Sequence, residues 1–315
     1  MSYPALVWRY LRLPKHDYVV LGYMGHLDIL VLWPFAKTRG IPIVWDAFLS
    51  LYNTVVEDRE LLARYNPLAL LLFCWEWLAC RLADSITLDT QAHGKYFSQK
   101  FRVPESKIKR VFVGAETDLF YPVQNKIRDR EIKTNVRPFT VLFYGQYIPL
   151  HGIKYIVQAA KLTEKDNIRW ILIGQGQEKQ TIVSLAQSMD VESITFIDWV
   201  PYKELLSYLH QADLCLGVFG DTDKTKRVIP NKVFQIIAAG SPLLTGDTPA
   251  IKELIPDECH GIGLVPVASA ESIAKSVVSL ARNPSQLLGV DFSGIIKQIS
   301  PKAIGRNFVE HLNGM

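Results

Sequence analysis

The chain has few cysteines, and their spacing suits neither a metal site nor a set of disulfides. It contains four, Cys74, Cys80, Cys215 and Cys259, which form no CxxC pair and lie mostly in apolar runs. Zinc sites and small disulfide-bonded folds both depend on characteristic cysteine spacings. We therefore interpret the four as reduced thiols within the protein core.

A large excess of charge of one sign is also missing. The 35 basic and 31 acidic residues give a formal net charge of +4, spread along the chain. This is too mild to indicate a nucleic-acid partner, although it permits an anionic ligand. With 49% hydrophobic content and 315 residues, the chain is too apolar to be disordered and long enough for two domains.

No signal peptide is recognisable at the N-terminus. Residues 1–15 include Arg9, Arg12 and Lys15 but no continuous apolar core before a small-residue cleavage site. We therefore expect a cytoplasmic protein.

The most apolar run, Leu68–Cys80, is shorter than a membrane span and is interrupted by Glu76. A buried helix is the favoured interpretation. The alternative is a helix resting on a membrane surface, because Trp75 and Trp77 lie near basic residues on both sides of the run.

Both halves of the chain alternate short apolar runs with helical ones, which is typical of parallel strands joined by helices. In the first half we expect strands at 18–23, 41–45, 86–88 and 109–113, and helices at 27–37, 59–83 and 91–101, with a break or kink near Pro67 in the second of these helices. In the second half we expect strands at 139–144, 168–173, 194–199, 214–219 and 262–267, and helices at 152–162, 178–189, 202–211, 270–282 and 303–312. The polar stretch between the halves predicts a linker at 125–137.

The segment from Ile229 to Thr245 begins like an anion site and ends on a strand. Pro230 suits the first turn of a helix, and the free amides that follow, from Asn231 on, point outward beside the ammonium group of Lys232. A phosphate is stabilised in such a place. Gly240 ends the predicted helix, and the alternative is an ordinary helix–strand unit with a suitable cap.

Two segments in this order and spacing resemble the family 4 glycosyltransferases of the GT-B type. Residues 113–122, VGAETDLFYP, look like the family's Gly-x-Asp-x-x-x-Phe-x-Pro sequence with Glu116 in place of the aspartate, and residues 230–242 are the second segment. The resemblance covers nearly the whole chain. It implies two Rossmann-like α/β domains facing across a cleft, with a nucleotide sugar bound mainly to the C-terminal domain.

The domains expected from this resemblance are a shortened acceptor-side domain at 1–124, a donor-binding domain at 138–298 and a C-terminal helix at 299–315. Enzymes that resemble this chain normally have a strand–helix–strand section before the segment that begins at Tyr18. Here only Met1–Asp17 precedes it. Either the chain starts late or the acceptor half is reduced.

The resemblance also assigns residues to the donor diphosphate. Gly145, Gln146, His151 and Gly152 frame a loop that could hold it, and the family commonly has arginine and lysine where Gln146 and His151 stand. Lys232 restores the missing positive charge, as does Arg227. A polar helix cap is the alternative interpretation of Gln146 and His151.

The family's two glutamates, eight positions apart, correspond to Arg227 and Gln235. We interpret Gln235 as a ribose contact, since an amide still bonds hydroxyls, and a polar residue on a helix face is the alternative. The segment 198–201 resembles the one that borders the nucleobase, which implies a backbone contact at Val200. Trp199 could equally belong to the core.

For acid/base chemistry in the first half we name Asp46, at a strand end, and His26, with Asp28 and His93 as further candidates. His26 and Asp28 could instead cap a helix. The family's usual histidine has no match after Asp46. We expect no metal, because Asp221 and Asp223 lie in a charged loop and no other cluster resembles a metal site.

We therefore predict a metal-independent, hexosyltransferase-like glycosyltransferase that acts with retention in polysaccharide or glycoconjugate biosynthesis. The expected partners are the nucleotide sugar and a glycan, lipid-linked or small-molecule acceptor, with no cofactor and no nucleic acid, in the cytoplasm or at the inner membrane surface as a peripheral protein. The alternative is a catalytically silent nucleotide-sugar-binding or partner subunit. A sugar-nucleotide epimerase would need a carboxylate pair that we cannot locate.

Overall fold

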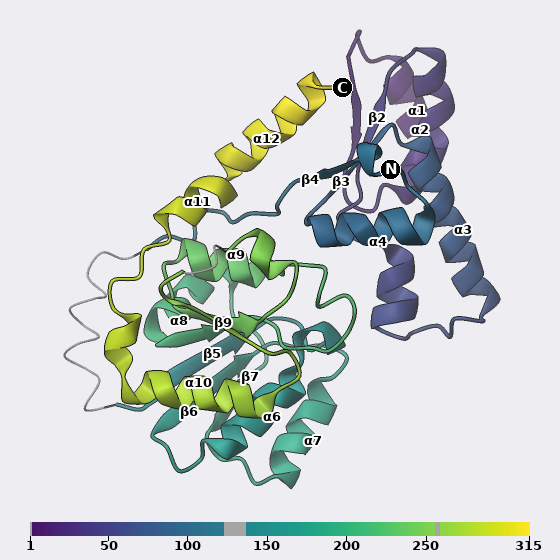
Figure 1. Ribbon diagram of the computed structural model, residues 1–315. Coiled ribbons are helices and arrows are strands. Elements are labelled where there is room, and N and C mark those ends of the chain that lie inside the picture. Colours follow the sequence, from purple (N-terminus) through teal and green to yellow (C-terminus); the bar gives the residue numbers. More distant parts are fainter. Residues whose placement is uncertain (1, 123–136, 256–258) are drawn as a thin grey trace. The chain divides into compact units, whose positions relative to one another are not determined.

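The computed structural model describes residues 2–122, 137–255 and 259–315, which form two compact units (Figure 1). The first unit consists of Met1–Phe112 and Arg306–Met315, and the second of Val113–Gly305. Each has its own parallel sheet, as predicted. All but the last residue of the linker predicted at 125–137 lies outside the described residues.

The first unit has a four-stranded parallel sheet in the order β1-β2-β3-β4. The strands are β1 (Val19–Leu21), β2 (Ile43–Asp46), β3 (Ser85–Leu88) and β4 (Ile108–Arg110), and the helices are α1 (Tyr3–Leu11), α2 (His26–Thr38), α3 (Pro67–Leu82) and α4 (Gln91–Phe101). α1 was not predicted. The break expected near Pro67 is the start of α3, where the Asn66 side chain accepts a hydrogen bond from the amide of Leu68. The helix expected at 59–66 is absent from the structure.

The second unit has a six-stranded parallel sheet in the order β10-β9-β8-β5-β6-β7. The strands are β5 (Phe139–Tyr144), β6 (Ile168–Ile173), β7 (Ile194–Ile197), β8 (Leu214–Leu216), β9 (Leu243–Gly246) and β10 (Ile262–Val265). The helices are α6 (Ile153–Leu162), α7 (Lys179–Ser188), α8 (Leu205–Gln211), α9 (Asn231–Ala238), α10 (Ala270–Arg282) and α11 (Ser293–Ile299). α12 (Pro301–Asn313) begins in the second unit and ends in the first.

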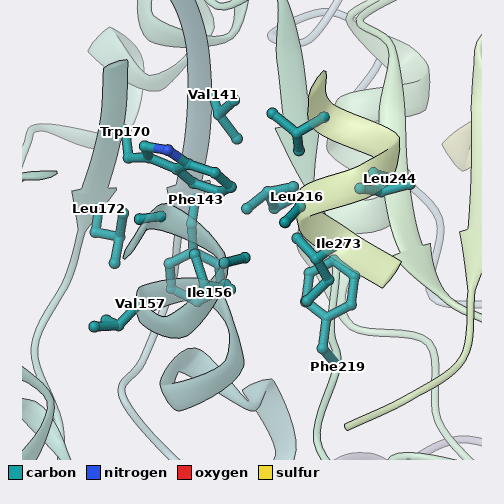
Figure 2. Packing of buried hydrophobic residues seen from close by; sticks show 14 of the residues in the cluster. Val141, Phe143, Ile156, Val157, Trp170, Leu172, Leu216, Phe219, Leu244 and Ile273 are labelled. Atoms are coloured by element: carbon teal, nitrogen blue, oxygen red, sulfur yellow. The ribbon is translucent and has the colours of Figure 1, made fainter. Parts of the chain in front are cut away.

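The main hydrophobic core of the second unit lies between its sheet and the helices α6, α7 and α10. Figure 2 shows Phe143 of β5 and Trp170 of β6 packed against Ile156 of α6, with Ile273 of α10 beside them. The central strands have apolar side chains on both faces, because a parallel sheet of this kind is covered on both. This rigid layer fixes the ends of β5 and β8, from which the candidate site is built.

Candidate functional site

The strand order of the second sheet reverses between β5 and β8. From β5 the chain adds β6 and β7 on one side, and then returns to add β8, β9 and β10 on the other. Ligands of open parallel sheets bind beyond the carboxyl ends of the strands at such a reversal. The segments that follow β5 and β8 contain most of the donor-binding residues predicted from the sequence.

Lys232 lies in the first turn of α9, and its amine is enclosed beside the end of β5. The residue is 5% exposed, and Nζ lies 3.7 Å from the centre of the Phe143 ring. Among the described residues, Nζ has no hydrogen-bond partner. Burial lowers the pKa of Lys232 well below its ordinary value. An unpaired buried amine destabilises the fold, so a ligand that brings negative charge would complete this site.

His151 lies close to the same place, at the end of the short helical turn Pro149–His151. Its buried ring donates from Nδ1 to the carbonyl oxygen of Gln146, which leaves Nε2 as the acceptor of the ring. Burial lowers the pKa of His151 well below its ordinary value, and the nearby Lys232 adds to this effect. The imidazole is therefore neutral at neutral pH, and positive charge at this point depends on Lys232.

Gly145 has no side chain, and this keeps the space between Lys232 and His151 open. A β-carbon at this position would lie 3.2 Å from Lys232 Nζ and 3.2 Å from His151 Cε1. The glycine has a φ of 141°, which other residues rarely adopt. A side chain here would fill the point toward which the lysine and the histidine converge.

The loop after β5 touches the segment after β8 backbone to backbone. Gly152, with a φ of 62°, is the N-cap residue of α6, and a β-carbon there would lie 2.4 Å from the amide nitrogen of Gly220. The amide of Phe219 donates to the carbonyl of His151 at 3.1 Å. The predicted loop is thus held close to the reversal point, with the first turn of α9 facing it through Lys232.

Gln235, further along α9, is bonded at both ends of its amide. Its Oε1 accepts from the hydroxyl of Tyr144 at 2.9 Å, and its Nε2 donates to the hydroxyl of Tyr202 at 2.9 Å. Tyr202 in turn donates to Glu116 at 3.1 Å. Glu116 and Gln235 are both departures from the family pattern, and one tyrosine connects them. The ribose contact of Gln235 stays a prediction.

The remaining donor-binding predictions fall at the rim of this region or beside it. Gln146 and Asn231 are exposed, Arg227 is half-buried in the segment before α9, and Val200 is buried after β7. Trp199 is 74% exposed, so the interpretation of this residue as part of the core is wrong. The structure does not test whether any of these residues contacts a donor.

In the first unit, Asp46 ends β2 as predicted and lies at the carboxyl edge of the sheet. It accepts a hydrogen bond from the hydroxyl of Thr87, on the neighbouring strand β3, at 2.9 Å. Burial raises the pKa of Asp46, the Thr87 bond partly offsets this, and Asp89 raises it further. A carboxylate of raised pKa is a stronger base, which suits the predicted role without testing it.

His26 begins α2, but its ring is only 2% exposed. Its Nε2 lies 3.4 Å from Oε1 of Glu76, and its ring packs edge-on against Trp45 with 4.8 Å between ring centres. No side chain caps α2, whose N-cap residue is Gly25, so the alternative of a capping role has no support in the hydrogen bonds. Of the two predicted catalytic residues, Asp46 is the more accessible.

Sequence reasoning missed the role of Glu76. Although it lies in the apolar run now seen as α3, its carboxylate is buried and accepts from the hydroxyl of Ser50 at 2.7 Å and the amides of Leu51 and Tyr52 at 3.1 and 3.0 Å. It therefore holds the loop that follows β2. A single carboxylate in an otherwise apolar helix was the available signal, because buried acids are rare unless they are paired.

A second pairing at this edge joins Asp89 and His93. His93 Nδ1 lies 2.7 Å from Asp89 Oδ1, and both side chains are buried. His93 was considered as an acid or base from the sequence, but not together with Asp89. Within residues 2–122, 137–255 and 259–315, no group of three or more His, Cys, Asp or Glu side chains could hold a metal ion.

Residues 138–283 match the family model described as Glycosyl transferases group 1. Two curated relatives match about half of the chain. The uncharacterized glycosyltransferase MJ1607 of Methanocaldococcus jannaschii is 25% identical over 183 residues, which cover 56% of this chain and 45% of the relative. TuaH of Bacillus subtilis is 24% identical over 173 residues, 55% of this chain and 42% of the relative. The chain thus spans less than half the length of these relatives.

Solved structures share the fold at low sequence identity. HepE of Anabaena, in complex with UDP, gives a TM-score of 0.75 at 13% identity over 99% of this chain and 82% of HepE. Sucrose-phosphate synthase of Thermosynechococcus elongatus gives 0.74 at 16% identity over 99% and 78% of the two chains. The fold is therefore that of two Rossmann-like domains of the GT-B type, and residues 138–283 are similar to the group 1 glycosyltransferases.

Proposed function

We propose that the protein transfers a sugar from a nucleotide-diphosphate donor, and that the donor diphosphate binds at the start of α9 beside Lys232. The observation that carries this proposal is the buried amine of Lys232, which has no partner among the described residues and lies where the strand order reverses. The amides of Asn231 and Lys232 at the start of α9 have no acceptor within the helix, and the N-cap residue Pro230 offers no side-chain acceptor. An anion would satisfy both groups.

The same groups would assist the departure of the nucleoside diphosphate. Negative charge accumulates on the leaving diphosphate as the glycosidic bond breaks, and preorganised donors stabilise it most where water is excluded. Lys232 can supply the cation and α9 the amides. The neutral His151 offers a hydrogen-bond acceptor at Nε2, which suits a hydroxyl of the sugar or ribose better than a phosphate. This chemistry requires no metal, and we propose that the reaction proceeds with retention.

We propose that the sugar acceptor binds to the first unit, where Asp46 is the candidate for the general base. Its raised pKa favours proton transfer from a hydroxyl, and it stands at the carboxyl end of its strand. The acceptor class that fits is a hydroxylated glycan or lipid-linked sugar. We place the reaction in the cytoplasm, with peripheral attachment at the inner membrane surface. Among the described residues, no helix is both long and apolar enough to cross a bilayer.

The decisive experiment is donor binding followed by thermal melting and calorimetry. UDP-sugars should be tried first, because HepE was solved with UDP, followed by guanosine and adenosine donors. A bound donor raises the melting temperature. Lys232→Ala should weaken binding by about 100-fold, because a charge-assisted contact to a diphosphate is lost. Lys161→Ala is the control, since Lys161 pairs with Glu164 on the surface.

Binding that is unchanged in Lys232→Ala would contradict the placement of the diphosphate. Turnover separates the enzyme from the second candidate, a silent nucleotide-sugar-binding subunit. That candidate is favoured by the absence of a cation at Gln146 and His151, where the family commonly has two. A silent subunit would bind the donor and release no nucleoside diphosphate with any acceptor offered.

A further inference from the structure

The expectation that the apolar run of α3 is buried holds for one face of the helix only. Ala69, Glu76, Ala79 and Cys80 face the core of the first unit. On the opposite side, Leu70 is 62% exposed, Leu71 61%, Leu78 40% and Trp77 39%. A helix that is apolar all round normally has both faces covered.

The exposed side chains of α3 form one continuous stripe. Positions 70, 71, 74, 77 and 78 recur at the spacing of a helix face, so Leu70, Leu71, Cys74, Trp77 and Leu78 lie on the same side. We call these five residues the α3 stripe. Leu61, Tyr65 and Leu68 add exposed apolar surface before it and in its first turn. Figure 1 shows α3 next to α2 at the outer edge of the first unit.

Basic side chains stand at both ends of the α3 stripe. Arg64 precedes the helix, and Arg81 ends it, with its guanidinium 4.9 Å from the centre of the Trp77 ring. Arg81 also donates to the backbone carbonyl of Arg102 at 2.7 Å, which brings a second arginine to this end. Residues 59–82 contain two acids, Glu60 and the buried Glu76. The exposed face of the helix itself therefore carries no negative charge.

We propose that the α3 stripe docks on the surface of an anionic lipid bilayer. Leucines in the middle, aromatic rings toward the ends and flanking arginines are the composition of a helix that lies in the membrane interface. α3 is 16 residues long, and no described helix qualifies as a span, so the helix would lie along the surface rather than cross it. The inference deepens the proposed membrane location and rests on it, but it does not depend on the donor assignment.

A second copy of the chain is a poorer occupant for electrostatic reasons. An isologous contact through α3 would bring the basic ends of two copies together in either orientation. Arg64 would approach Arg81 and Arg102 of the other copy in an antiparallel pair, and each arginine would approach its own equivalent in a parallel pair. Like charges would then meet with no acid on the helix face to neutralise them. Anionic lipid headgroups instead neutralise both ends at once.

The test is sedimentation of the full chain with vesicles of phosphatidylcholine, alone or mixed with phosphatidylglycerol. We expect binding to the mixed vesicles and much weaker binding to neutral ones. The double variant Leu71→Ser with Leu78→Ser should bind at least about tenfold more weakly, because two apolar side chains no longer enter the interface. Leu162→Ser with Val309→Ser is the control, since these residues are 57% and 52% exposed and lie outside the stripe. Its binding should match that of the unmodified chain.

The charge contribution is tested by Arg81→Gln. It should lower binding to mixed vesicles by about fivefold and leave binding to neutral vesicles unchanged. This variant also carries the test if the leucine double variant melts early. Circular dichroism of each variant verifies the fold.

Failure of the unmodified chain to sediment with mixed vesicles would overturn the proposal. So would a change from dimer to monomer in the leucine double variant, because the stripe would then be an interface between copies. The donor-induced rise in melting temperature should persist in that variant. Loss of vesicle binding with donor binding intact separates this proposal from the proposed function.

Discussion

The two units each bury an ionisable side chain, and the two side chains differ in their hydrogen bonding. In the first unit, Glu76 accepts hydrogen bonds from one hydroxyl and two backbone amides and lies beside His26. In the second unit, Lys232 is just as enclosed but its amine has no partner among the described residues. Burial alone therefore does not distinguish a structural charge from a functional one.

The difference lies in what the charge is for. The carboxylate of Glu76 has its hydrogen-bond partners within the protein, so these bonds stabilise the loop after β2 and need no ligand. Lys232 is left unsatisfied, so the folded state bears a cost that a bound anion would remove. His26, chosen from the sequence as a catalytic candidate, stands beside the satisfied carboxylate. The contrast favours a structural environment for His26 and a binding role for Lys232.

Removing the carboxylate of Glu76 should have the largest effect on stability. Glu76→Ala leaves the hydroxyl of Ser50 and the amides of Leu51 and Tyr52 without an acceptor inside the protein. We expect a loss of about 3–5 kcal/mol in the free energy of unfolding. Urea denaturation measures it, and hydrogen exchange should show lost protection at the two amides.

The control for this change is Glu310→Ala on α12, where the side chain is exposed and should cost no more than about 0.5 kcal/mol. Donor binding in the second unit should survive Glu76→Ala. A variant as stable as the unmodified chain would mean that the loop after β2 does not depend on this carboxylate, and the contrast between the units would fail.

Replacing the buried Lys232 and the half-buried Lys179 of the second unit by methionine should change the stability in opposite directions. Lys232→Met keeps the volume and removes an unpaired buried amine, so we expect stabilisation of about 1–3 kcal/mol together with loss of donor binding. Lys179 is the matched control: its Nζ lies 3.2 Å from Asp198 and 3.3 Å from the carbonyl of Gly174. Lys179→Met should therefore destabilise the fold. Destabilisation by Lys232→Met would show that the amine has a partner in the unliganded protein.

The advantage of Lys232→Met should also depend on pH. The pKa of Lys232 in the folded protein is well below 10.5, its ordinary value, so the unfolded chain binds the extra proton between the two values. As pH falls from 10.5, the free energy of unfolding of the unmodified chain falls by about 1.4 kcal/mol per pH unit, until the pH reaches the pKa of Lys232 in the folded protein. The stability difference between the two proteins should grow over that window and then level off. A difference that is constant with pH would contradict the lowered pKa.

The fold and the start of α9 could both be predicted from local patterns. The alternation of apolar runs with helices predicted two parallel sheets, and Pro230 followed by Lys232 marked a helix start, because both signals act over a few residues. The bonding of Glu76 and the exposure of α3 could not be predicted. Both depend on which face of an apolar helix meets the sheet, and the run LALLLFCWEWLAC is apolar on every face.

The hydrogen bonds of Gln235 could not be predicted from the sequence either. Tyr144 and Tyr202 are 91 and 33 positions away, so only the fold brings their hydroxyls to the amide. From the sequence, Gln235 was a weakened form of a family glutamate. In the structure, the amide of Gln235 accepts a hydrogen bond from Tyr144 and donates one to Tyr202, and a carboxylate could not do both.

The smallest expected effect concerns the hydrogen bonds that join Gln235, Tyr202 and Glu116. These side chains have partners, unlike Lys232, and two of them are exposed, unlike Glu76. In Gln235→Glu, both Glu116 and the new carboxylate need the single proton of Tyr202, so one of them loses its bond and two negative charges come close. We expect a loss of about 1 kcal/mol, limited by the exposure of Tyr202 and Glu116. Adding Glu116→Gln reverses the direction of both hydrogen bonds, because the new amide donates to Tyr202 and Tyr202 donates to the carboxylate at position 235. Urea unfolding of both single variants and the double variant should show recovery of most of the loss, a coupling that distant sites lack. Strictly additive losses would mean that Tyr202 does not connect the two positions, and that each departure from the family pattern stands alone.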